Sequence, residues 1–296
     1  MAGKSRWIRG VLLLGLILGV AVGLPVKEGR KTAGIETVQA AEAVKKKTSE
    51  TIRWDPKWKY AKNSAIHSGK AKLYYAKKNR KDIVVCVNAG HGTKGGSNVK
   101  TLCHPDGSAK VTSGSTAKGA KKATAVAYGT TMKDGTPEHK VTLKLAKVLK
   151  KRLLETGYDV LMIREGEDVQ LDNIARTVMA NNKADCHIAL HYDSTMTDKG
   201  VFYMSVPKVK AYRSMEPVAS LWKEHEKLGK ALIRGLEEKK VKIFSGGSMA
   251  MDLTQTSYST ISSIDLEVGD RASDYSEKTL ERLAKGIIAG INKYFK

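Results

Sequence analysis

The chain of 296 residues carries a formal net charge of +22 at pH 7. Its length suffices for one buried core of catalytic size with extensions, and its charge predicts attraction to a polyanion. Three cysteines, Cys86, Cys103 and Cys186, exclude a disulfide-rich scaffold, and the lack of a C-x-x-C pair argues against a cysteine zinc site.

The first 40 residues are typical of a secretory signal peptide. Basic residues precede an apolar stretch at 11–24, which is too short for a comfortable transmembrane helix, and the small residues of "VQAAEA" follow. We therefore expect residues 1–40 to be a signal peptide, cleaved after Ala40 or retained as an anchor. The protein is then expected to act outside the cytoplasm, secreted or associated with the cell wall. Its basic surface is expected to meet anionic cell-wall polymers rather than nucleic acid, with membrane contact only if the anchor is retained.

Residues 41–80 form a basic extension that contains two tryptophans and three tyrosines. Pure linkers lack aromatic residues. We therefore expect part of this extension to pack on the folded domain or to contact ligand.

From residue 82 onward, apolar runs that predict strands alternate with apolar residues at helical spacing, which predict helices. The predicted strands are 83–87, 159–163, 187–191, 201–206 and 263–268, and the predicted helices are 141–153, 171–178, 218–236 (as one helix or two) and 280–291. This alternation predicts an α/β fold, with a mostly parallel twisted sheet flanked by helices, as a single catalytic domain over residues 81–296.

Residues 93–137 interrupt the alternation between the first strand and the first helix. This insert is rich in Gly, Ser, Thr and Lys, and it contains the turn signals "HPDGS" and "KDGT". Ala125, Val126 and Tyr128 indicate at least one hairpin within it. Loops of this length are usually functional, disordered or small subdomains.

Four residues lie at comparable places in this pattern. His91 follows the first strand, His191 ends "HIALH", Glu267 lies near the end of "SIDLEV", and Glu138 opens the first helix. Strand ends in an α/β sheet converge on ligands, and two histidines with one glutamate form a known catalytic zinc set. A further glutamate that does not bind the metal is what zinc-assisted hydrolysis needs as a general base. Taken singly, Glu138 is also explained by the helix dipole, and Glu267 by an ion pair with a lysine.

The other histidines are weaker candidates. His187 shares a strand face with His191 but lies four residues away, which is roughly 13 Å. His139 points about 100° around the helix from Glu138. The remaining three are expected at the surface: His67, His104 and His225. The sequence contains no HExxH motif, which excludes a thermolysin-type site.

Five sequence blocks connect these residues: "VNAGHG" (87–92), "EHKVTLKLAKVLKKRL" (138–153), "GYDVLMIR" (157–164) with Leu171, Arg176 and "AN" (180–181), "ALHYD" (189–193), and "IDLEVG" (264–269). In content and order they resemble the motifs of the zinc-dependent N-acetylmuramoyl-L-alanine amidases found among bacterial autolysins and sporulation amidases. The resemblance covers residues 82–296.

The resemblance implies one zinc ion held by His91, Glu138 and His191. It also implies that Glu267 takes a proton from the attacking water and returns it to the leaving amine. The implied reaction is hydrolysis of the amide between N-acetylmuramic acid and L-alanine in peptidoglycan. Two alternatives remain open from the residues alone. One is a zinc peptidase that cuts within the stem peptides and uses the same site, and the other is a non-catalytic wall-binding protein that retains the fold.

The chain departs from the family pattern at several positions. Asn88 stands where an aspartate is common, Asp193 stands where an asparagine is common, and "DRASD" (270–274) replaces the usual apolar-then-polar run. The insert at 93–137 is also longer than usual. Because both of its ends carry expected metal ligands, we expect it to build one wall of the substrate groove.

Overall fold

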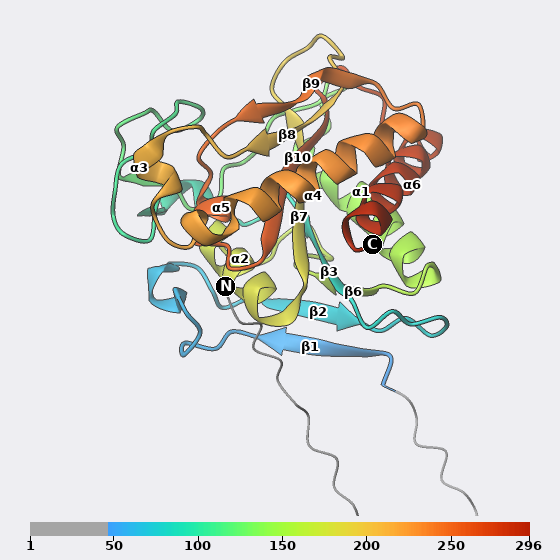
Figure 1. Ribbon diagram of the computed structural model, residues 1–296, viewed down its shortest axis with the longest axis horizontal. Helices are drawn as coiled ribbons and strands as arrows, with labels where there is room; N and C mark the ends of the chain where they lie inside the picture. Colours follow the sequence, from blue (N-terminus) through green and yellow to red (C-terminus); the bar gives the residue numbers. More distant parts are fainter. Residues whose placement is uncertain (1–46) are drawn as a thin grey trace, which may run out of the picture. The chain divides into compact units, whose positions relative to one another are not determined.

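One eight-stranded mixed sheet organises the protein, seen in a computed structural model that describes residues 47–296 (Figure 1). Across the sheet the strands are β1 (Ser49–Arg53), β2 (Lys70–Tyr74), β6 (Asp159–Met162), β3 (Val84–Ala89), β7 (Cys186–Asp193), β10 (Ser262–Asp270), β8 (Val201–Ser205) and β9 (Ile243–Ala250). The four central strands β6, β3, β7 and β10 are all parallel. Their carboxyl ends therefore meet at one edge of the sheet, where α/β proteins bind ligands.

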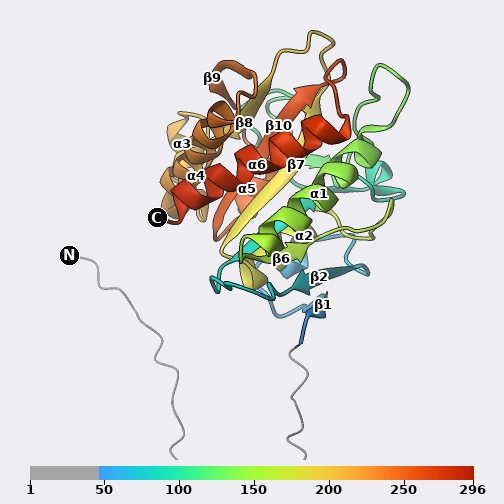
Figure 2. The same cartoon turned by 90° about the vertical axis from the view of Figure 1, so that its right-hand side faces the viewer.

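Helices cover both faces of the sheet. On one face α1 (Glu138–Glu155), α4 (Val218–Glu238) and α6 (Glu277–Tyr294) lie side by side, with α6 between the other two (Figure 2). Their apolar residues pack against one side of the central strands. On the other face lies α2 (Asn173–Lys183), and the short α5 (Thr254–Tyr258) packs against it. A single turn, α3 (Lys210–Arg213), precedes α4.

The predicted α/β architecture is confirmed, and each predicted strand and helix is present. Residues 218–236 form one helix rather than two. Five elements were not predicted from the sequence: β1, β2, α3, β9 and α5. In β9, at the border of the sheet, the run "IFSGGSMA" lacks the apolar alternation of a half-buried strand, because neither of its faces is consistently buried.

The described part of the extension, residues 47–80, joins the same compact unit as the rest of the described chain. It supplies β1, β2 and a short 3-10 turn at Ala61–Asn63. Trp54, Trp58 and Tyr60 pack against α2 and Tyr258. The signal peptide expected at 1–40, with its cleavage site, lies outside the described residues.

The insert contains a small antiparallel pair, β4 (Lys100–Leu102) and β5 (Lys122–Thr124), and a 3-10 turn at Gly96–Asn98. The insert therefore contains a hairpin-like pair, but its strands end just before Ala125, Val126 and Tyr128, the residues that predicted it. Ala125 and Val126 are buried, and their amides donate to the carbonyls of Val99 and Gly96, which holds this segment against the start of the insert.

Two further observations concern the described residues as a whole. Cys86, Cys103 and Cys186 are buried and form no disulfide. Cys186 is in register with Val85, so it and Cys86 point to opposite faces of the sheet. Among residues 47–296, no helix is both long and apolar enough to cross a bilayer.

Candidate active site

Three of the predicted residues converge at the carboxyl edge of the central strands. His91 follows β3, Glu138 is the first residue of α1, and His191 lies on β7. His91 Nε2 lies 3.0 Å from Glu138 Oε1 and 3.0 Å from His191 Nδ1. His191 Nδ1 and Glu138 Oε1 are 3.2 Å apart. The three atoms thus form a nearly equilateral triangle, and within residues 47–296 this is the one group of three or more His, Cys, Asp or Glu side chains placed to hold a metal ion.

This triangle fits a zinc ion. Zinc binds imidazole nitrogen and carboxylate oxygen at about 2.0–2.2 Å with tetrahedral geometry, which places neighbouring ligand atoms roughly 3.3 Å apart. The observed separations of 3.0 to 3.2 Å need only a small expansion to reach that value. A set of two histidines and one glutamate also leaves a fourth position for water or substrate, as catalytic zinc sites do.

The backbone at His91 is strained and is held in place by hydrogen bonds from two arginines. His91 has a φ of 61°, in the left-handed region that residues with a Cβ rarely adopt. Two buried arginines fix this loop by its carbonyl oxygens, since Arg176 Nη2 donates to His91 O over 2.7 Å and Arg164 Nη2 donates to Gly90 O over 3.0 Å. A Cβ at Gly90 would lie 2.3 Å from His191 Cε1. Glycine is therefore required there so that the backbone passes close to the second histidine.

The end of the insert supports two of the three residues directly. Ala127 O accepts a hydrogen bond of 2.8 Å from His91 Nδ1, which leaves Nε2 free to bind a metal. The amide of Thr130 donates to Glu138 Oε2 over 2.7 Å. Between them, Gly129 passes so close that a Cβ would lie 2.7 Å from both His91 Cδ2 and Glu138 Oε2. The insert therefore orients the imidazole and the carboxylate.

Glu267 lies beside this cluster on β10, in register with His191 on β7. Its side chain is buried, and Oε2 has no hydrogen-bond partner. Asp265 is two residues earlier, on the same face of β10, with Oδ2 3.7 Å from His191 Nε2. Asp265 was not among the residues predicted from the sequence, although the period of two from Glu267 placed it on the site's side of the strand.

Electrostatics separate the roles of the two glutamates. Burial raises the pKa of Glu138, but His91 and His191 outweigh burial and hold that pKa below its usual range. Glu138 is therefore ionised, as a metal ligand must be. Burial and the neighbouring Asp265 instead raise the pKa of Glu267 well above its usual range. A carboxyl group with a raised pKa is suited to accept and return a proton near neutral pH.

A groove of about 600 Å³ opens over these residues. Besides His91, Glu138, His191, Asp265 and Glu267, its walls come from three places. They are the insert (Lys110, 114–116, 123–124 and 126–130), the segment from the end of β9 into α5 (Met251 and 253–255), and α2 (Asn173 and Arg176), and further lining residues come from the sheet itself (Asn88, 192–194 and Met204). The insert therefore lines the groove that holds the candidate catalytic residues.

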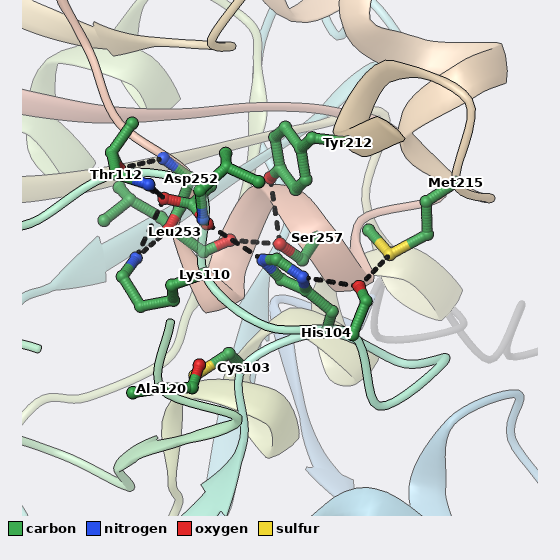
Figure 3. A network of polar contacts seen from close by, with 12 residues as sticks. Cys103, His104, Lys110, Thr112, Ala120, Tyr212, Met215, Asp252, Leu253 and Ser257 are labelled. Atoms are coloured by element: carbon green, nitrogen blue, oxygen red, sulfur yellow. Dashed lines mark hydrogen bonds and ion pairs between the residues drawn. The ribbon is translucent and has the colours of Figure 1, made fainter. Parts of the chain in front are cut away.

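A buried network centred on Asp252 fastens the insert to the segment between β9 and α5 (Figure 3). The Asp252 carboxylate accepts hydrogen bonds from His104 Nε2 and Lys110 Nζ, each over 3.1 Å. It also accepts from the amides of Val111 and Thr112, over 2.7 and 3.0 Å. Because the carboxylate is almost fully buried, these bonds compensate its desolvation and fix the position of the insert.

The positions expected from the sequence to depart from the family pattern have structural partners. Asn88 Oδ1 accepts from Arg176 Nη1 over 3.2 Å, and Asp193 pairs with Lys199. Within "DRASD", Arg271 Nε donates to Thr131 O over 2.7 Å, and Arg271 O accepts from the amide of Lys133. The DRASD segment therefore contacts the end of the insert.

The remaining histidines lie outside the cluster. The interpretation of His104 and His225 as surface histidines is wrong, because each is only 1% exposed. His187 is buried with Nδ1 against the hydroxyl of Ser263, and His67 stacks on Trp54. His104 was missed because its partner, Asp252, is 148 residues away in the chain.

Comparisons with known proteins agree with this geometry. The sequence model of the family described as N-acetylmuramoyl-L-alanine amidase (Amidase_3) matches residues 85–293. No curated protein matches the chain.

Solved structures share the fold. One is the N-acetylmuramyl-L-alanine amidase Ami1 from Mycobacterium smegmatis, with a TM-score of 0.58 and 17% identity over 73% of this chain and 98% of that one. Ami1 from Mycobacterium abscessus has a TM-score of 0.55 and 18% identity over 73% of this chain and 99% of that one. An N-acetylmuramoyl-L-alanine amidase from Clostridium difficile 630 has a TM-score of 0.52 and 18% identity over 72% of this chain and 96% of that one. Since the family match runs from β3 into α6 and includes each residue of the convergent cluster, this chain belongs to the N-acetylmuramoyl-L-alanine amidase family.

Proposed function

We propose that this protein is an exported, zinc-dependent N-acetylmuramoyl-L-alanine amidase. It hydrolyses the amide between N-acetylmuramic acid and the L-alanine of the peptidoglycan stem. The observation that carries the proposal is the convergence of His91, Glu138 and His191 within 4.8 Å of one another, with Glu267 in the same groove.

The residues divide the work as follows. His91, Glu138 and His191 hold one zinc ion, which supplies Lewis-acid polarisation of the scissile carbonyl and lowers the pKa of water. Glu267 accepts a proton from the attacking water as the C–O bond forms. It then donates that proton to the amide nitrogen as the C–N bond breaks, releasing a lactyl carboxylate and the free amine of L-alanine.

Outside the groove, the proposal follows the sequence. Residues 1–40 serve as signal peptide or anchor, 41–80 as the extension and 81–296 as the catalytic domain, with its insert at 93–137. The protein then acts outside the cytoplasm, secreted or attached to the wall, on peptidoglycan.

The test is digestion of purified cell wall, followed by identification of the new termini. The proposal expects free muramic lactate together with a free L-alanine amine, lost when a chelator removes the metal and restored by zinc. New termini inside the stem peptide would instead identify a zinc peptidase. Wall binding without new termini would identify a non-catalytic binder.

A further inference from the structure

A second cavity, of about 620 Å³, lies over the outer side of α4 and the end of α6. It shares no lining residue with the groove over the candidate active site. Seven of its eleven lining residues are lysine or arginine, and only one, Glu226, is acidic. We call this cavity the α4 groove.

The cations of the α4 groove are arranged in a row along the helix. Four of them lie on one face of α4 at steps of four, three and four residues: Lys223, Lys227, Lys230 and Arg234. On an α-helix this spacing places successive side chains about 5–6 Å apart. The row therefore presents positive charge at regular intervals over about 16 Å.

Most of these charges have no acidic partner. Lys227 lies 4.0 Å from Glu224, and Lys293 pairs with Glu238 over 2.6 Å. The other five cations of the groove form no ion pair with any residue of 47–296: Lys208, Arg213, Lys223, Lys230 and Arg234. Mutual repulsion among these positive charges destabilises the folded protein, and an anionic ligand that binds between them reduces this repulsion.

One end of the α4 groove is held rigidly. Arg213 donates from Nε to Pro207 O over 3.0 Å and from Nη2 to Val206 O over 2.9 Å. Its guanidinium carbon lies 4.1 Å from the centre of the Trp222 ring. A cation fixed in this way loses little side-chain entropy when it binds a ligand.

The α4 groove is remote from the catalytic residues. Tyr294, one of its lining residues, bonds to the hydroxyl of Ser262 at the start of β10. Glu267 is five residues further along the same strand, which is roughly 16 Å. A ligand in the α4 groove is therefore not the amide that reacts.

We propose that the α4 groove binds an anionic phosphodiester polymer of the cell wall. Regularly spaced lysines match a ligand that carries one charge in each short repeat, and lysine is a common phosphate partner. A concave site suits a polymer strand better than a flat membrane surface. The α4 groove thus holds the protein on a wall polymer while the catalytic groove remains free.

The chain provides its own control for charge alone. On α1, four exposed lysines have the same spacing of four, three and four: Lys140, Lys144, Lys147 and Lys151. Lys140 pairs with Glu167 over 3.4 Å. The cavity beside Lys144 and Lys147 contains three acidic residues against four basic ones. The two rows therefore carry the same formal charge in different surroundings.

The experiment measures binding of a fluorescent poly(glycerol phosphate) oligomer to the purified full chain by anisotropy, at 50 and 200 mM salt. One variant carries Lys223→Gln, Lys227→Gln, Lys230→Gln and Arg234→Gln, and the control carries the four matching Lys→Gln changes on α1. The α4 variant is expected to bind at least tenfold more weakly at 50 mM salt. Its salt slope should fall by about 2–3, at about 0.7 for each lost contact. The α1 variant is expected to bind within about threefold of the unchanged protein.

One further variant and two further ligands are measured in the same way. A variant with Lys223→Arg, Lys227→Arg and Lys230→Arg retains the charge and should bind within about twofold, which separates lost charge from damaged folding. Equal weakening in the α1 variant, or no binding of the oligomer, would overturn the proposal. The proposal would also be overturned if an oligothymidylate or phosphatidylglycerol vesicles bound more tightly than the poly(glycerol phosphate) oligomer and the α4 variant lost that binding. Because binding is measured without turnover, failure of the proposed amidase activity leaves this result intact.

Discussion

His91 Nδ1 donates a 2.8 Å hydrogen bond to the carbonyl oxygen of Ala127, a residue 36 positions further along the chain. Ala127 belongs to the insert at 93–137, so the insert also supports the candidate metal site. A ligand histidine commonly has its second nitrogen fixed in this way, and loss of such a partner lowers metal affinity by about 10- to 100-fold. The insert therefore orients a ligand and also lines the groove.

The close approach of Gly129 to the cluster gives the first prediction. We expect Gly129→Ala to lower zinc affinity at least tenfold, because its Cβ would lie 2.7 Å from both His91 and Glu138. Zinc binding stabilises the folded protein by an amount that grows with the logarithm of the free zinc concentration divided by Kd, so thermal unfolding at several zinc concentrations measures the change in affinity. The matched control is Gly119→Ala, which has a similar φ of 88° but no atom within 4 Å of the added Cβ. Equal zinc affinity in the two variants would contradict the prediction.

The second prediction concerns the proton carrier. We expect Glu267→Gln to lower turnover of muramoyl-L-alanine substrates by about 10²- to 10⁴-fold, because the amide can neither take nor return the proton. Zinc should still raise its melting temperature as in the unchanged protein, since Glu267 is not in the ligand triangle. The control is Glu155→Gln at the far end of α1, which should retain full activity. Full activity in Glu267→Gln would rule out this assignment.

The buried Asp252 network predicts a dependence of stability on pH. Burial raises the pKa of Asp252, but hydrogen bonds from His104 and Thr112 and the charge of Lys110 outweigh burial and hold the pKa well below its usual range. Its stabilisation is therefore complete above the unfolded pKa of about 3.9 and is lost as the pH falls through the lower folded pKa.

Asp252→Asn should therefore reduce the free energy of unfolding by about 2–4 kcal/mol at pH 7. The difference from the unchanged protein should narrow as the pH falls below 4. Urea unfolding at pH 7, 4 and 3 measures it. Asp82→Asn is the control, since Asp82 is 78% exposed and its ion pair with Arg80 is expected to contribute less than about 1 kcal/mol. A deficit that stays constant down to pH 3 would contradict the role given to the charge.

Residues 104–120 of the insert, which we call its arm, are bound to Asp252 and give a fourth prediction. Cys103 and Lys121 are joined by a backbone hydrogen bond, so residues 104–120 can be replaced by two glycines without moving 127–130. Combined with Asp252→Asn, to leave no uncompensated buried carboxylate, this deletion should impair turnover of intact wall much more than zinc binding. Release of new termini and the zinc-dependent melting shift measure the two effects. Comparable loss of both would show that the arm is not a wall for substrate.

The sequence predicted what depends on local periodicity. Apolar runs and helical spacing located the central strands and the major helices, because burial of one face imposes those patterns. The same patterns placed His91, Glu138 and His191 at element ends. Parallel strands bring such ends to one edge of the sheet, so their convergence followed from the fold class.

The tertiary structure decided what depends on contacts between distant segments. Local sequence does not reveal that Ala127 accepts from His91, or that His104 and Lys110 meet Asp252 in the interior, because the partners are 36, 148 and 142 residues apart. A lysine row on α1 and one on α4 also look alike in sequence. Only packing determines which row borders a cavity with three acidic residues and which borders a cavity with one, because a side chain's electrostatic surroundings are set by its neighbours in space.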